Sequence, residues 1–125
     1  MPRLTAKECI KNGIPVGLGT DGGCAFVRAY DTWRELYYFC KYVGVSTAYS
    51  LYTATKRNAE ILGIDEKTGT VEVGKNADMV VLNGNPLEDL TVLKNPFAVI
   101  KNGKVYKNIK LKKRKDVEDA LNSIM

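Results

Sequence analysis

The fold of this 125-residue chain depends on one stretch of sequence, Ile14-Pro15-Val16-Gly17-Leu18-Gly19-Thr20-Asp21-Gly22-Gly23. Its apolar part, residues 14–19, is bounded by helix breakers and predicts a short buried strand with Pro15 at its start. Residues 4–12 before it predict a short helix that ends at Gly13. A helix, a tight turn and a buried strand in this order are typical of a parallel α/β sheet.

Two further helices are predicted after the strand. Residues 25–43 form the first, and Gly44 ends it. Its apolar side chains recur at helical spacing and predict a core-facing stripe, namely Trp33, Leu36, Tyr37 and Cys40. Ser46 can cap the second helix, which runs to about Leu62.

A β-rich region follows the helices. Residues 77–82 predict a strand, and residues 97–106 predict a hairpin with Asn102-Gly103 at its turn. A short connecting helix is expected at 86–90, and a last helix capped by Asp116 is expected from there to Met125. Three strands would leave exposed edges, so this unit is expected to pair with something else.

Two of these regions resemble one enzyme family. Residues 14–23 are similar to the eighth barrel strand of the amidohydrolase superfamily, where a short apolar strand ends in Gly-Thr-Asp or Gly-Ser-Asp. The longer motif runs through Ala54-Thr55, Asn58-Ala59-Glu60-Ile61-Leu62-Gly63, Gly69 to Leu82, Asn85 to Leu90 and Val99 to Val105. It resembles the C-terminal stretch of amidohydrolases near imidazolonepropionase and the prolidase-like enzymes. Together the likeness covers roughly residues 5–107.

This resemblance implies an α/β fold: the C-terminal fragment of a (β/α)8 metallo-hydrolase barrel plus part of a small β-sandwich. Residues 1–66 would be the last barrel strand and its helices. Residues 67–109 would be the sandwich portion, and residues 110–125 a basic tail with a short helix. Active residues of such barrels lie at the C-terminal ends of strands, where Asp21 would sit.

The resemblance also implies two roles for Asp21: metal ligand, and carrier of a proton from the metal-bound water to the leaving nitrogen. The metal of the intact family is divalent, with zinc expected here. The family's other ligands are histidines and a carboxylated lysine from earlier strands, and this chain contains no histidine. Because zinc needs three or four protein ligands, the chain alone is expected neither to hold metal nor to hydrolyse anything.

Other residues carry weaker indications. Arg28, Tyr30 and Arg34 follow the Asp21 loop, where an intact barrel would hold substrate, and arginine suits carboxylates. Arginines on exposed helix faces are, however, usually solvated. Asp21 could instead cap the following helix or the turn at Gly22-Gly23, whereas Asp78 is expected to make a structural hydrogen bond.

Composition limits the remaining possibilities. The net charge is +5, and six of the basic residues lie in the segment 107–115, KNIKLKKRK. No aromatic residue interleaves with them, so a solvated linker is expected rather than a nucleic-acid site. The three cysteines lie far apart and predict reduced thiols. No apolar run could span a bilayer and no signal peptide is recognised, so no membrane contact and a cytoplasmic location are expected.

Two functions therefore remain open. In the first, the chain is part of a carbon–nitrogen hydrolase for a small amide or dipeptide, and missing strands complete it. It would then be a truncated chain, the product of a split gene, or half of a two-chain enzyme. In the second, it is a non-catalytic module that self-associates through its unpaired edges and apolar faces.

Overall fold

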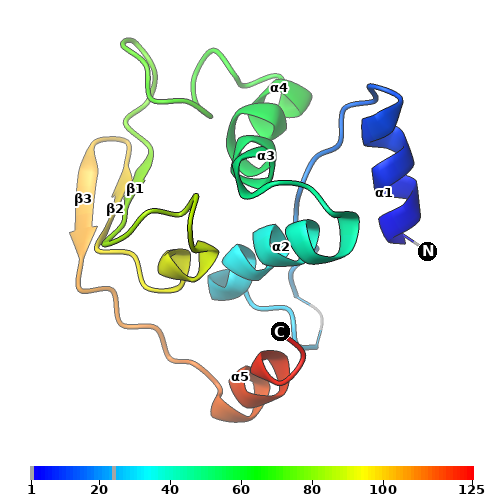
Figure 1. Cartoon of the computed structure of the whole chain (residues 1–125). Coiled ribbons are helices and arrows are strands. Elements are labelled where there is room, and N and C mark those ends of the chain that lie inside the picture. Colours follow the sequence, from blue (N-terminus) through cyan, green and yellow to red (C-terminus); the bar gives the residue numbers. More distant parts are fainter. Residues whose placement is uncertain (1, 24) are drawn as a thin grey trace.

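A computed structural model of the protein describes residues 2–23 and 25–125, with side chains from residue 5 onward. The first helix, α1 (Pro2–Lys11), ends where Gly13 takes a left-handed φ of 71°, as the sequence predicts. The chain then runs extended through residues 14–20. Figure 1 shows α1 on the side of the molecule opposite the strands, where it contacts residues 39–43.

The prediction of a buried strand at residues 14–19 is wrong. Within the described residues no strand is formed there, and Ile14 is 53% exposed. An extended segment becomes a strand only when a neighbour pairs with its backbone groups. The described strands all lie elsewhere in the chain and pair among themselves.

The two predicted helices are present, each as a composite of helix types. A 3-10 helix (Ala29–Asp31), α2 (Thr32–Tyr38) and a π-helix (Phe39–Val43) follow one another, and a left-handed Gly44 ends them. The predicted start at residue 25 is too early, since Phe26 has a φ of 66°, which a helix does not permit.

The second composite consists of α3 (Thr47–Tyr52), a π-helix (Thr53–Arg57) and α4 (Asn58–Leu62). The Ser46 side chain accepts a hydrogen bond from the Tyr49 N–H at 3.1 Å, which confirms the predicted cap. Gly63 ends the helix with a φ of 67°.

The β region is a three-stranded antiparallel sheet of β1 (Met79–Val81), β2 (Ala98–Lys101) and β3 (Lys104–Lys107), in that order. Asn102 and Gly103 both have positive φ, as the predicted hairpin turn requires. Asp78 accepts the Asn102 N–H at 2.8 Å and pairs with Lys101 at 2.8 Å, so its expected structural role is confirmed. In place of the helix predicted at 86–90, residues 86–88 form a turn and a 3-10 helix spans Leu90–Lys94.

The hydrophobic core lies between the helices, the 3-10 helix and the sheet. Ser50 is fully buried and donates to the Leu36 carbonyl at 3.0 Å, which ties α3 to α2. The predicted stripe on α2 supplies Trp33 and Leu36 to this core, while Tyr37 and Cys40 are only partly covered. The buried apolar side chains are Trp33, Leu36, Phe39, Val43, Ala59, Leu90, Ala98 and Val117.

The last helix, α5 (Lys115–Asn122), is attached to α2 through buried Arg34. The Arg34 guanidinium donates to Glu118 at 3.3 Å and to Asn122 at 3.0 Å, and it pairs with Asp31 at 3.3 Å. Arg34 is therefore a structural residue rather than a solvated one. Asp116 does not cap α5 as predicted, because it lies inside the first turn and pairs with Arg114.

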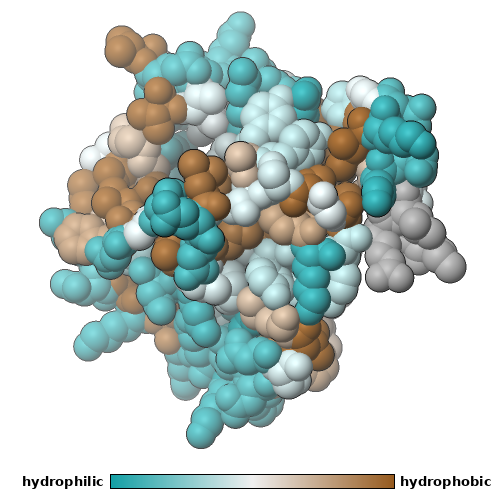
Figure 2. Space-filling view, in the orientation of Figure 1, coloured by the Kyte–Doolittle hydropathy of each residue, from teal (hydrophilic) through white to brown (hydrophobic). Residues whose placement is uncertain are grey.

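Several apolar side chains remain on the surface. Figure 2 shows them gathered over the strand side of the molecule and between α1 and the body. The most exposed are Val73 at 107%, Val71 at 80% and Leu62 at 69%. No helix in the described part of the chain combines the length and hydropathy of a membrane span.

Arg34→Ala is expected to lower the free energy of unfolding by about 3–5 kcal/mol, because it leaves the buried Asp31 carboxylate without an ion-pair partner and leaves Glu118 with only Lys94 at 3.9 Å. Urea denaturation followed by the fluorescence of Trp33 measures the change. The matched control is Arg57→Ala, which breaks a half-exposed pair with Glu60 and should cost only about 0–1 kcal/mol. Equal costs for the two variants would contradict the structural role of Arg34.

Candidate functional site

Asp21 is exposed and lies between the extended segment 14–20 and the turn at Gly22-Gly23. Its φ of 49° is left-handed, a conformation that aspartate and asparagine tolerate better than most residues. The alternative role as a helix cap is wrong, since the next helix begins at Ala29 and its cap position is Arg28. The Asp21 carboxylate is thus free of a helix-capping role and lies at the end of an extended segment.

Asn58 of α4 fixes this segment in place. Its side-chain oxygen accepts the Leu18 N–H at 2.9 Å, and its side-chain amide donates to the Leu18 carbonyl at 2.7 Å. One side chain thereby satisfies both backbone groups of a residue, as a neighbouring strand would do. Gly17 permits the approach, because a Cβ there would lie 3.0 Å from the Asn58 oxygen.

Sequence reasoning did not identify Asn58 as a positioning residue. Asparagine has a low propensity for helix interiors, because its side chain forms hydrogen bonds with backbone groups that compete with those of the helix. Asn58 also follows directly on the π-helix Thr53–Arg57, and local π geometry is frequent at functional sites. An asparagine inside a predicted helix was therefore the available signal, but its partner, Leu18, lies 40 positions away and could not be identified from sequence.

A pocket of about 160 Å³ opens beside Thr20, the neighbour of Asp21. It lies between the loop after Asp21, α2 and α5. Of the two predicted substrate-binding residues, Arg28 lines this pocket and is half-buried, whereas Tyr30 is not part of its wall. Tyr30 instead packs its ring against the Lys113 ammonium, 5.6 Å from the ring centre.

Only some of the charged side chains that line this pocket have an oppositely charged partner. Arg34 and Asp31 form an ion pair at 3.3 Å. Burial raises the pKa of Glu35 above its usual range. Burial also raises the pKa of Tyr38, against the opposing effect of the Arg34 charge. The pocket is consequently a polar, partly desolvated site rather than a purely apolar one.

The donor set for a metal ion is incomplete. Among the described residues no group of three or more His, Cys, Asp or Glu side chains lies close enough together to hold an ion. Asp21 supplies one carboxylate, and a zinc site needs three or four protein ligands. The described residues alone do not fit a complete metal centre.

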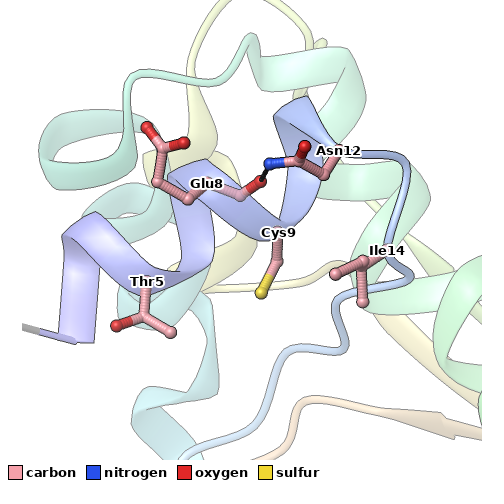
Figure 3. A pocket seen from close by; sticks show the side chains of 5 residues that line it. All are labelled: Thr5, Glu8, Cys9, Asn12 and Ile14. Atoms are coloured by element: carbon pink, nitrogen blue, oxygen red, sulfur yellow. Dashed lines mark hydrogen bonds between the residues drawn. The ribbon is translucent and has the colours of Figure 1, made fainter.

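A second hollow of about 410 Å³ lies beside α1. Figure 3 shows Cys9 and Ile14 on one side of the helix and Glu8 pointing elsewhere, with the Asn12 side chain bonded to the Glu8 carbonyl at 2.7 Å. Cys9 is a free thiol, as is Cys40, while Cys24 lies outside the described residues. With one carboxylate and one thiol, this open groove has no arrangement suited to catalysis.

Comparison with known proteins identifies the family. Residues 3–106 match the model of the Amidohydrolase family. This chain belongs to that family. The match begins within α1, includes Asp21 and Asn58, and ends in β3, so that α5 lies outside it.

Individual amidohydrolases agree with this assignment. A crystal structure from Bifidobacterium longum, proposed to be a prolidase, is 44% identical, with a TM-score of 0.91 over 94% of this chain. Ochratoxinase from Aspergillus niger is 33% identical over 105 residues, or 78% of this chain. Imidazolonepropionase from Symbiobacterium thermophilum is 32% identical over 82 residues, or 66% of this chain.

This chain spans only part of each relative: 29% of the Bifidobacterium protein, 20% of ochratoxinase and 19% of the imidazolonepropionase. The relatives are hydrolases that act on carbon–nitrogen bonds. The chain is therefore an α/β fragment in comparison with them, and it carries the segment around Asp21 without most of their length.

Asn58→Ala should release the Asp21 segment. We expect the Leu18 amide to exchange faster with solvent deuterium, and the free energy of unfolding to fall by about 1–3 kcal/mol, because both Leu18 backbone groups lose their partner. Amide exchange followed by NMR measures the first effect. Asn12→Ala, which removes one exposed bond within α1, is the control and should leave Leu18 unchanged. Unaltered exchange at Leu18 in Asn58→Ala would rule out the clamp.

Proposed function

We propose that this chain is the C-terminal part of a (β/α)8 amidohydrolase that hydrolyses a carbon–nitrogen bond in a small amide or dipeptide. Residues 1–66 would contribute the last barrel strand and its helices. Residues 67–109 would contribute part of the small β-sandwich, and residues 110–125 the basic tail and α5. The observation that carries the proposal is the exposed carboxylate of Asp21 at the end of a clamped extended segment.

Two properties of the extended segment support its place in a barrel. Its backbone is held by Asn58 on one side, and Ile14 is half-exposed, as expected for a strand whose neighbours come from other segments. Composite helices follow it directly, as helices follow strands in such barrels. Barrel enzymes place their reactive groups where strands end, which is the position of Asp21.

In the completed enzyme a divalent ion, for which zinc is the expected choice, would supply the activated water. Asp21 would provide one of its ligands, and its carboxylate could hold a proton destined for the leaving nitrogen. Arg28 would face the substrate from the adjacent pocket. Tyr30 was the other residue predicted to bind substrate, and it would need to turn away from Lys113 to do so.

The isolated chain is expected to retain less than stoichiometric zinc after dialysis and to show no turnover of dipeptides or N-acyl amino acids. Adding a chain that carries the remaining barrel strands should restore both. In that complex Asp21→Asn is expected to lower turnover by about 10²–10⁴-fold, since asparagine keeps the left-handed backbone but cannot take up a proton. Zinc analysis and an amidase assay measure these effects.

Asp65→Asn is the control for charge removal, because Asp65 is an exposed carboxylate in the loop after α4. It should leave both zinc content and turnover unchanged. Tight stoichiometric zinc together with turnover by the chain alone would contradict the incomplete site. Full turnover by Asp21→Asn in the restored complex would remove Asp21 from the mechanism.

A second candidate function rests on the exposed apolar surface. Val71 and Val73 are fully accessible on the segment before β1, and further apolar residues are exposed on the sheet and at the end of α4. Exposed apolar side chains that gather into a patch mark an interaction site. A non-catalytic module that pairs with itself, or with a complementing chain, would cover it.

If self-association covers this surface, the isolated chain should sediment as a dimer or larger species. Val71→Lys with Val73→Lys should then shift it to monomer, because two buried ammonium groups would oppose association. Analytical ultracentrifugation or light scattering measures the shift. The control is Thr91→Lys with Glu88→Lys, at exposed positions in the turn 86–88 and in the 3-10 helix Leu90–Lys94. A wild-type chain that is monomeric at high concentration and binds no hydrophobic dye would exclude the requirement for a partner copy.

A further inference from the structure

Three Asn-Gly pairs occur in the chain, at Asn12-Gly13, Asn83-Gly84 and Asn102-Gly103. Asparagine is most prone to deamidation before glycine, because the next backbone nitrogen can attack the side-chain amide and glycine has no side chain to hinder the approach. All three pairs are exposed, so water and hydroxide reach each of them. Neither the residue types nor the exposure distinguish the pairs, and the difference among them lies in their hydrogen bonds.

The pair at the end of α1 is held at both reacting groups. The Gly13 N–H donates to the Ile10 carbonyl at 3.0 Å. The Asn12 side-chain amide donates to the Glu8 carbonyl at 2.7 Å. A nitrogen that donates a hydrogen bond is harder to deprotonate, and a side chain bonded to the helix must give up that bond before it can react. Both effects slow the attack at Asn12.

The pair in the hairpin between β2 and β3 is held at its backbone. The Gly103 N–H donates to the Ala77 carbonyl at 3.0 Å. The Asn102 N–H donates to the Asp78 carboxylate at 2.8 Å, and the turn keeps Asn102 at a φ of 48°. For ring closure the Gly103 nitrogen must lose its proton and turn toward the Asn102 side chain, which breaks this arrangement. The hairpin therefore opposes deamidation at Asn102.

The pair after β1 has neither restraint. Asn83 and Gly84 form a bend between β1 and the turn at residues 86–88. Among the described residues, the Gly84 N–H has no acceptor and the Asn83 side chain has no hydrogen-bond partner. The two reacting groups can consequently approach each other without the loss of a hydrogen bond within the protein.

We propose that Asn83 is a self-modifying site, at which the Gly84 backbone nitrogen converts the asparagine into aspartate and isoaspartate. The nitrogen gives its proton to hydroxide and bonds to the Asn83 Cγ, and the Cγ–Nδ2 bond breaks as ammonia leaves with a proton from water. Water then opens the cyclic imide. Cleavage at Cγ leaves aspartate, and cleavage at the main-chain carbonyl carbon leaves isoaspartate. The net reaction consumes one water and releases one ammonia, and no residue of the candidate functional site takes part.

The two products differ in their effect on the fold. Aspartate adds a carboxylate to an exposed bend, whereas isoaspartate also lengthens the main chain before Gly84 by one atom. Gly84 has little room to move, since a Cβ on it would lie 2.9 Å from the Val92 Cγ1. Val92 belongs to the 3-10 helix that supplies buried Leu90 to the core. Isoaspartate is therefore expected to loosen this helix, and aspartate is not.

Incubation of the folded 125-residue chain at mildly alkaline pH, followed by peptide mapping with mass spectrometry, compares the three sites in one sample. Asn83 is expected to deamidate about tenfold faster than Asn12 and Asn102, because hydrogen bonds oppose the reaction at those two sites. Equal rates at the three sites, or a slower rate at Asn83, would overturn the proposal.

The same incubation in concentrated urea is the control for the flanking sequence. Once the fold is lost, the three sites should deamidate at similar rates, because the hydrogen bonds that protect Asn12 and Asn102 are gone. A tenfold preference for Asn83 that persists in urea would attribute the difference to the neighbouring residues and overturn the structural argument.

Two variants test the assignment of the groups. Asn83→Gln should remove the rapid reaction, because glutamine would have to close a larger ring. Asp78→Ala removes the acceptor of the Asn102 N–H, and it should speed deamidation at Asn102 while leaving the rate at Asn83 unchanged. Circular dichroism verifies that both variants fold. Rapid ammonia release that continues in Asn83→Gln would overturn the proposal, and an unchanged rate at Asn102 in folded Asp78→Ala would overturn the account of its protection.

Asn83→Asp separates the effect of the charge from that of the longer main chain. This variant should unfold at the same urea concentration as the unmodified chain, as followed by the fluorescence of Trp33. The isoaspartyl form, separated from incubated protein by chromatography, should unfold at a lower urea concentration. Equal midpoints for the isoaspartyl and unmodified chains would contradict the predicted loosening of the 3-10 helix.

Discussion

The double hydrogen bond between the Asn58 side chain and the Leu18 backbone is the contact on which the site depends. An extended segment without strand neighbours has backbone groups that only water or a side chain can satisfy. At Leu18 a carboxamide supplies both a donor and an acceptor, in the manner of a missing strand. The segment therefore keeps its direction, and Asp21 stays at its end. Gly17 is the condition for this contact, because a side chain at that position would crowd the amide.

Arg34 makes the second contact that positions the candidate site, because it attaches α5 to α2. A buried guanidinium between two carboxylates holds α5 against α2, and carbonyl oxygens of the last residues accept from Tyr37 and Lys41. A buried ion pair contributes little net stability, but removing one partner leaves a buried charge uncompensated, which opposes separation of the two helices. This geometry places Leu121 and Ile124 opposite the loop after Asp21. The pocket thus depends on an arginine for which the sequence indicated either a weak substrate-binding role or a solvated position.

Local sequence signals predicted the elements well, and non-local contacts account for the errors. Gly13, Gly44, Gly63 and Asn102-Gly103 all take positive φ where a helix end or hairpin turn was expected, because this preference belongs to the residue itself. The strand at residues 14–19 failed because pairing depends on another segment. The burial of Arg34 could not be inferred, since its partners Glu118 and Asn122 are far away in the sequence. Asp21 could be placed at the end of the extended segment, whereas Asn58 and the α5 wall required coordinates.

The exposed apolar side chains and the isolated Asp21 carboxylate both lack neighbouring groups that would stabilise them. A side chain such as Val73 or Leu62 loses the gain from burial, about 25 cal/mol per Å² of apolar area, wherever it meets water. Under the proposed function, Asp21 in this chain lacks the further ligands that would share an ion with it. Further strands beside the extended segment, in the barrel proposed above, would supply those ligands and cover part of the apolar surface. Completion of the fold and completion of the metal site would accordingly be one coupled equilibrium, in which ion binding adds to the affinity between the parts.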